Sequence, residues 1–169
     1  MSTSFERFYE KVDYQLYIDM DGTLTDFDDA FTRTGIYNGT MEEYEERVGA
    51  AKAWADIKKQ GEKFWSEMNW FKDSKLLWAY CEKYHPTILT TTPFNNPASK
   101  TGKLKWIVRE LGKDVPVLFS KNKGEHATPN RILIDDYQKK IDNWTKNGGI
   151  GILHKSTQET IQQLKNLNL

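Results

Sequence analysis

The sequence predicts an α/β protein: a Rossmann-like parallel sheet of about five strands flanked by helices, with a small all-helical cap inserted after the first strand. Three observations support this fold class. Five short apolar runs are typical of buried strands, helical patterns separate most of them, and the stretch 28–85 after the first run holds helical patterns only. Strands that alternate with helices are typical of a parallel sheet covered on both faces.

The five expected strands are rich in aromatic and β-branched residues, and turn residues bound them. They are YQLYID (14–19), TILTTT (87–92), VPVLFS (115–120), RILID (131–135) and IGILH (150–154). Apolar residues spaced three and four apart predict three helices among and after the last four strands. One covers 104–111 and stops at Gly112, one ends at Gly148, and Ser156 with Glu159 opens the last as a capping box.

Residues 28–85 interrupt this alternation with helices alone. Thr40 and Glu43 form a capping-box pattern, and a helical stripe of apolar residues follows it. The segment 61–84 is predicted to be further helix with a break near Asn69. We therefore expect 28–85 to be a cap inserted into a catalytic core that consists of 1–27 and 86–169.

Composition narrows the function classes. The net charge is zero, which disfavours nucleic acid as a partner, although Lys and Arg outnumber Asp and Glu 13 to 7 within 86–169. No apolar run is long enough to span a membrane, and the first residues lack the apolar core of a signal peptide. With Cys81 as the single cysteine, we expect a cytoplasmic protein that binds no membrane. The oligomeric state stays open, a homodimer included.

Acidic residues follow two of the expected strands directly. Asp19 ends the first strand, and Asp135 and Asp136 end the strand at 131–135. In an open parallel sheet, ligands bind at the carboxyl ends of the strands, so these carboxylates should meet at one edge. Clustered carboxylates need a cation, and ligand sets of oxygen alone suit Mg²⁺. The alternative, unrelated surface acids, fits poorly because both groups follow strongly apolar runs.

Four stretches resemble the sequence motifs of the haloacid dehalogenase superfamily. DMDGT (19–23) resembles the first motif, and ILTTT (88–92) the second. Lys103, at the start of the next helix, fits the third, and ILIDD (132–136) fits the fourth. The four stand in order on the expected elements, which makes the resemblance far more specific than one motif alone.

The resemblance implies a role for each residue. Asp19 would be the nucleophile that forms an aspartyl-phosphate, and Asp21 would protonate the leaving group and then activate water. Thr91 and Lys103 would hold phosphate oxygens. Among the three consecutive threonines, strand alternation lets only some face the site, and we expect Thr91 to do so.

The same resemblance implies the metal ligands and the turn. Mg²⁺ would be held by Asp19, by Asp21 through its backbone carbonyl, and by Asp135 and Asp136, one of these two through water. Gly22 would permit the tight turn and Thr23 would help to fix it. An acid at position 21 indicates phosphate chemistry, because the dehalogenase branch lacks it.

A closer resemblance is to the 5'(3')-deoxyribonucleotidases, in the stretches 21–31, 90–112, 118–124 and 132–154. It implies a phosphoric monoester hydrolase that acts on nucleoside, chiefly deoxyribonucleoside, monophosphates. Thr92 stands where that family has Ser, and Lys121 or Lys123 takes the place of an arginine in its basic loop. The resemblance is weak across 35–75.

Aromatic residues of the cap could stack on a nucleobase. Phe27 is the first candidate for substrate binding, followed by Phe31, Trp65 and Trp70. Phe64 and Phe71 are further candidates. The alternative for any one of them is core packing, because aromatic residues at helical spacing usually pack inward.

Two other functions stay open. The same chemistry could act on a sugar phosphate or on the 3'-phosphate end of a nucleic acid. The fold could also carry a catalytically silent binding protein, which the intact Asp19, Asp21, Lys103, Asp135 and Asp136 disfavour.

Overall fold

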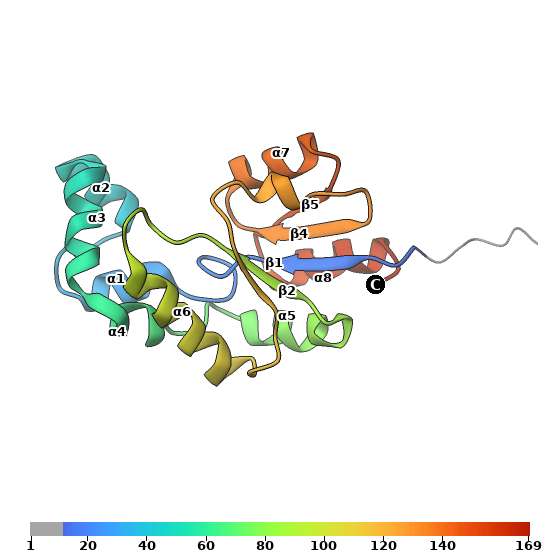
Figure 1. Ribbon diagram of the computed structural model, residues 1–169, viewed down its shortest axis with the longest axis horizontal. Helices are drawn as coiled ribbons and strands as arrows, with labels where there is room; N and C mark the ends of the chain where they lie inside the picture. Colours follow the sequence, from blue (N-terminus) through green and yellow to red (C-terminus); the bar gives the residue numbers. More distant parts are fainter. Residues whose placement is uncertain (1–11) are drawn as a thin grey trace, which may run out of the picture.

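The computed structural model describes residues 12–169 and confirms the predicted fold class (Figure 1). In this part of the chain, five parallel strands form one sheet in the order β3-β2-β1-β4-β5. They are β1 (Gln15–Ile18), β2 (Thr87–Thr90), β3 (Val117–Phe119), β4 (Arg131–Asp135) and β5 (Ile150–Leu153). Each lies within its predicted run, shorter by up to three residues at its ends.

Helices surround the sheet and extend beyond one edge of it. They are α1 (Phe27–Arg33), α2 (Met41–Val48), α3 (Ala50–Lys59), α4 (Gly61–Ser66), α5 (Ser74–Cys81), α6 (Pro97–Glu110), α7 (Gln138–Lys146) and α8 (Thr157–Asn166), with short 3₁₀ turns η1 (Glu82–Tyr84) and η2 (Lys123–His126). None of the helices described is long and apolar enough to cross a membrane.

Side chains alternate between the two faces of the sheet, as strand geometry requires. Tyr17, Leu89 and Leu133 pack on one face against Ile141 and Trp144 of α7. The opposite face belongs to the larger core cluster, to which α5 and α8 contribute Leu77, Cys81 and Leu164. Both faces of the central strands are therefore buried, which explains their continuous apolar runs.

The structure contains the capping box and the helix break predicted for the segment 28–85, but it divides the predicted helical stripe into two helices. Thr40 and Glu43 form the capping box, because the Thr40 side chain accepts from the Glu43 amide and the Glu43 carboxylate accepts from the Thr40 amide. The stripe that follows is divided by Gly49, whose φ of +83° ends α2 and begins α3. The break predicted near Asn69 separates α4 from α5.

Contacts divide the segment that we expected to be one cap. Figure 1 shows α1–α4 beyond the carboxyl ends of the strands, where α4 packs against α6. Helix α5 instead packs against α8 beside the sheet. Helix α5 thus lies beside the sheet although it belongs to the segment 28–85, and the division into core and cap stays a prediction.

Candidate active site

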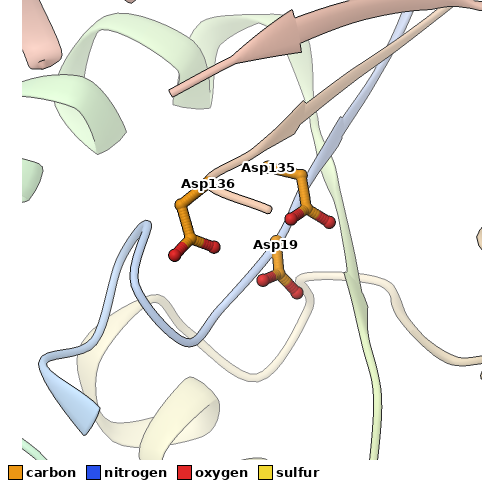
Figure 2. Close-up of side chains that lie close together, drawn as sticks. All are labelled: Asp19, Asp135 and Asp136. Atoms are coloured by element: carbon orange, nitrogen blue, oxygen red, sulfur yellow. The ribbon is translucent and has the colours of Figure 1, made fainter. Parts of the chain in front are cut away.

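Pairing of β1 with β4 brings the predicted carboxylates together. Ile18 is opposite Ile134, and the Asp19 amide donates to the Ile134 carbonyl at 2.8 Å, so Asp19 and Asp135 leave the sheet side by side. Asp19 is 8% exposed and Asp135 is 1% exposed. Oxygens of Asp19, Asp135 and Asp136 lie within 4.8 Å of one another, and Figure 2 shows the three side chains gathered at this edge.

Lys123 supplies the positive charge inside this cluster. Its buried Nζ donates to Asp19 Oδ1 at 2.5 Å and to Asp135 Oδ2 at 2.6 Å. Burial opposes its charge, but the two carboxylates outweigh that effect and raise the pKa of the Lys123 ammonium. The loop that carries it is fixed on α7, where the Gly124 amide donates to Asn143 Oδ1 at 2.8 Å.

One lysine does not neutralise three carboxylates. Burial, then repulsion from Asp19, raises the pKa of Asp135 to about 6, although Lys123 opposes the rise. Asp136 is exposed at the margin of the cluster, yet desolvation by the surrounding protein, then Asp19 and Asp135, raises its pKa to about 7. A set of oxygen donors with unbalanced negative charge fits a divalent cation such as Mg²⁺. Both Asp135 oxygens accept hydrogen bonds, from Lys123 and from the Tyr137 amide, which leaves Asp136 and Asp19 as the better direct ligands.

Gly22 is required by the close approach of Asp136. A Cβ at Gly22 would stand 2.1 Å from Asp136 Oδ2, and the φ of +77° is one that side chains rarely adopt. The turn is fixed by Thr25 and not, as expected, by Thr23. The Gly22 amide donates to the Thr25 carbonyl at 2.8 Å, whereas the buried Thr23 hydroxyl has no hydrogen-bond partner within the described residues.

Asp21 is held at both carboxylate oxygens. The Thr25 hydroxyl lies 3.2 Å from Oδ1, and Lys103 Nζ donates to Oδ2 at 2.6 Å. Lys103 also donates to Thr90 Oγ1 at 2.9 Å and to the Thr91 carbonyl at 2.7 Å. The lysine assigned to the third motif therefore contacts Asp21, and Lys123 from the expected basic loop contacts Asp19.

The three threonines have different surroundings. Thr90 is buried, and its hydroxyl accepts from Lys103. Thr91, which we expected to hold phosphate, donates its hydroxyl to the Ser120 carbonyl at 2.9 Å. Thr90 and Thr91 both line the small cavity over the carboxylates, and Thr92 lines the larger cleft beside it. Strand spacing alone did not distinguish them, because β2 ends at Thr90.

Two connected cavities meet at this edge. One of about 200 Å³ is lined by Asp19, Asp135, Asp136 and Lys123. A cleft of about 800 Å³ opens beside it, between α3 and α4 of the cap and the loop that follows β2. The two share three lining residues, Asp21, Thr91 and Lys140. A group bound over Asp19 could therefore extend into the cleft.

Most of the aromatic residues chosen from the sequence pack inward and are not among those that line the cleft. Phe27 contacts Phe64, Trp54 and Trp65, at centroid separations of 5.3–6.0 Å. Phe31 is fully buried, beside Tyr44. Phe27 and Phe31 therefore pack in the way that the alternative interpretation, core packing, describes for aromatic residues at helical spacing.

Trp70 lies away from the cleft as well. Its ring contacts Trp106, with a centroid separation of 4.9 Å, and its Nε1 donates to Glu110 at 2.8 Å. Trp65 is the one aromatic candidate from the sequence that lines the cleft, with 1% of its surface exposed.

Two aromatic residues that sequence reasoning missed also line the cleft. Trp54 comes from α3 and is half-buried, and Phe94, in the loop after β2, is 84% exposed. The signal for Phe94 was available, since a large apolar residue between Pro93 and Asn95 in a loop has no helical face to pack against. Trp54 carried no such signal.

Lysines line the same cleft. Lys121 was expected there, and its Nζ lies 4.8 Å from the centroid of the Phe94 ring. Lys58 of α3 and Lys140 of α7 were not expected. Lys140 Nζ donates to the Lys121 carbonyl at 2.8 Å, which fixes it between the cleft and the small cavity. Only Asp21 among the lining residues is acidic, so the cleft favours an anion.

Comparison with solved structures gives the fold. A hydrolase of the haloacid dehalogenase (HAD) superfamily from Ehrlichia chaffeensis is 12% identical to this chain. The match covers 92% of this chain and 97% of that chain, with a TM-score of 0.52. The chain shares the α/β fold of that hydrolase. This agrees with the superfamily resemblance of the four motifs. The resemblance to deoxyribonucleotidases stays a prediction.

Two further solved structures are similar at lower TM-scores. A hydrolase from Streptococcus pneumoniae TIGR4 is 17% identical, over 90% of this chain and 99% of that one, with a TM-score of 0.47. A phosphonoacetaldehyde hydrolase like protein from Oleispira antarctica is 15% identical, over 91% and 85%, with a TM-score of 0.44. No family model and no curated protein matches the chain.

Proposed function

We propose that this chain is a Mg²⁺-dependent phosphomonoesterase that works through an aspartyl-phosphate. The observation that carries the proposal is the position of Asp19. It stands at the carboxyl edge of the sheet with Lys123 on one oxygen, Asp21 two residues later, and a cavity of about 200 Å³ in front of both. This volume suits a phosphate group.

The chemistry follows from the two carboxylates. Lys123 holds Oδ1 of Asp19, so we assign the attack on phosphorus to Oδ2. An Asp19–phosphorus bond forms, the bond from phosphorus to the leaving oxygen breaks, and Asp21 gives its proton to that oxygen. Asp21 then takes a proton from water, which attacks phosphorus, frees Asp19 and releases inorganic phosphate.

The chain's own residues also balance charge at this site. Asp19 and Asp136, with Asp135 beside them, would hold the Mg²⁺ ion, which supplies charge neutralisation and alignment of the phosphoryl group when bound. Lys123 places a positive charge between Asp19 and Asp135, with a hydrogen bond to each. Lys140, which lines both cavities, is placed to contact an anionic substrate.

For the substrate we propose a nucleoside monophosphate, with deoxyribonucleotides first because of the sequence resemblance. The cleft next to Asp21 has Trp54 and Phe94 on its walls, and aromatic faces of this kind stack on nucleobases. Lys58 and Lys121 add positive charge near them. The volume of about 800 Å³ is ample for a base and a sugar.

A second substrate class has its own support. Three lysines along one open cleft would also suit the 3'-phosphate end of a nucleic acid, whose further phosphates continue past the site. A polymer substrate would make turnover fall steeply with salt, whereas a mononucleotide would show a shallow dependence. A sugar phosphate has no base, so its binding would require neither Trp54 nor Phe94.

The test is phosphate release from ribo- and deoxyribonucleoside 5'- and 3'-monophosphates, sugar phosphates and a 3'-phosphorylated oligonucleotide, with Mg²⁺ or with a chelator. We expect metal-dependent release that is highest on deoxynucleotides. Release from sugar phosphates alone would retain the chemistry and refute the nucleotide substrate. A folded protein that releases phosphate from none of them would favour the silent binding protein.

A further inference from the structure

We infer that Lys103 is a positioning residue that fixes the carboxylate of Asp21, and that Trp65 of helix α4 covers the Lys103 ammonium. The inference rests on the proposed function, in which Asp21 is the acid and then the base. It replaces the role of phosphate ligand that the sequence motif gave to Lys103.

The first reason is that every donor of Lys103 is engaged. An ammonium group has three N–H donors. Nζ gives them to Asp21 Oδ2, Thr90 Oγ1 and the Thr91 carbonyl, at 2.6–2.9 Å. The side chain is 1% exposed. A phosphate could take one of these hydrogen bonds only if another were broken.

The second reason is the geometry of Asp21. Lys103 holds Oδ2, and the Thr25 hydroxyl lies 3.2 Å from Oδ1 and also 3.2 Å from the Met20 carbonyl, while the Asp21 side chain stays 29% exposed. It lines both the small cavity and the cleft. The same carboxylate must meet the leaving oxygen in one step and water in the next, and such transfers depend strongly on orientation.

The third reason is the wall around Lys103. A Cβ at Gly102 would stand 2.6 Å from both the Glu62 carbonyl and Trp65 Cβ, so glycine allows α4 to approach α6 this closely. Trp65 then covers Lys103, with Nζ 5.2 Å from its ring centroid. Trp65 therefore both covers Lys103 and lines the cleft.

The two buried lysines therefore have separate tasks. Lys123 contacts Asp19 and Asp135, the nucleophile and a residue of the metal site. Lys103 contacts Asp21. If Lys103 bound phosphate, its loss would weaken substrate binding; if it positions Asp21, its loss would mimic damage to Asp21 itself.

The test is a double-mutant cycle with Lys103→Met and Asp21→Asn, assayed on a deoxynucleoside 5'-monophosphate. We expect Lys103→Met to lower kcat about 100-fold with KM changed less than about threefold, and the double variant to be no slower than Asp21→Asn within about threefold. Lys105→Met, two residues along the same helix in an exposed ion pair with Glu62, should leave kcat near the wild-type value.

Two results would overturn the inference. One is a large rise in KM for Lys103→Met with kcat retained, which is the signature of a lost phosphate contact. The other is a double variant whose loss is the product of the two single losses, which would mean that the residues act independently.

A second variant and a second readout keep the question decidable. Thr90→Val removes one Lys103 partner without changing the shape of the residue, and it should give a weaker form of the same pattern; unchanged kcat in this variant would contradict the inference. If the wild type hydrolyses no phosphomonoester, the proposed function fails by itself. A crystal structure of Lys103→Met then decides the inference, through a displaced or an unmoved Asp21 carboxylate.

Discussion

Lys123 Nζ lies 2.5 Å from Asp19 Oδ1, across 104 residues of sequence, with both side chains buried. The same nitrogen is 2.6 Å from Asp135. A residue outside the four motifs as we assigned them therefore holds the centre of the site together, and its removal is the most informative single change.

Lys123→Met should destabilise the protein and stop turnover. Two buried carboxylates would lose their partner, and breaking a buried ion pair from one side costs about 3–5 kcal/mol. Urea unfolding should show a smaller loss of unfolding free energy at about pH 5 than at about pH 8, because Asp135 with its raised pKa takes up a proton at the lower pH. An equal cost at both pH values would contradict this account of the cluster.

Asp19→Asn should abolish turnover while the fold persists. The amide cannot attack phosphorus, and Lys123 still has Asp135 as a partner. Rapid quench followed by mass spectrometry should detect a phosphorylated peptide containing Asp19 in the wild type and none in the variant. Asp114→Asn, an exposed acid far along the chain, serves as the matched control and should behave like the wild type. Substantial turnover by Asp19→Asn would refute the aspartyl-phosphate.

Metal binding should depend on pH with a definite sign. The pKa values of Asp135 and Asp136 are raised from 3.8 to about 6 and about 7, so between about pH 4 and about pH 7 the folded protein without metal holds more protons than the unfolded chain. Its stability should therefore fall as pH rises through this window.

Added Mg²⁺ should reverse that loss. Thermal unfolding with Mg²⁺, compared with unfolding in a chelator, should show strong stabilisation by the metal at about pH 8 and little at about pH 5. Protons compete for the same oxygens at the lower pH. Asp136→Asn should remove most of the difference. Stabilisation by Mg²⁺ that is equal at both pH values would place the ion elsewhere.

Gly22→Ala should damage the metal site more than its backbone strain explains. The added Cβ would collide with Asp136 Oδ2, and φ is +77°. Gly35 is the matched control, because its φ is +71° but a Cβ there meets nothing within 4 Å. Gly35→Ala should cost about 1–2 kcal/mol of stability with activity kept. Gly22→Ala should also lose Mg²⁺-dependent stabilisation and turnover, and equal behaviour of the two variants would exclude the contact with Asp136.

The sheet and its carboxylates could be predicted because their signals are local. Ile18 and Ile134 belong to continuous apolar runs, and the acids follow directly where parallel strands end. Lys123 could not be placed in the same way. It is one lysine among several in a loop, and its burial depends on how η2 packs on α7, which no local pattern encodes.

The cap was harder to predict because its pattern is ambiguous. Phe27, Phe31 and Trp54 all follow helical spacing, and that spacing does not distinguish a core position from one at the edge of a cleft. In the structure Trp54 lines the cleft between α3 and the loop after β2, whereas Phe27 packs against the Trp54 ring and is not among the lining residues.

Removing the aromatic walls should raise KM for nucleotides selectively. Stacking of a base on an aromatic side chain contributes about 1–3 kcal/mol, so Trp54→Ala or Phe94→Ala should raise KM for a deoxynucleotide about 5- to 150-fold. KM for p-nitrophenyl phosphate, which has no base, should change much less. Trp70→Phe is the control, since that ring packs on Trp106 away from the cleft. Because Phe94 is 84% exposed, its loss should leave the melting temperature unchanged, and a parallel rise in KM for both substrates would mean that these residues only shape the loop and the cap.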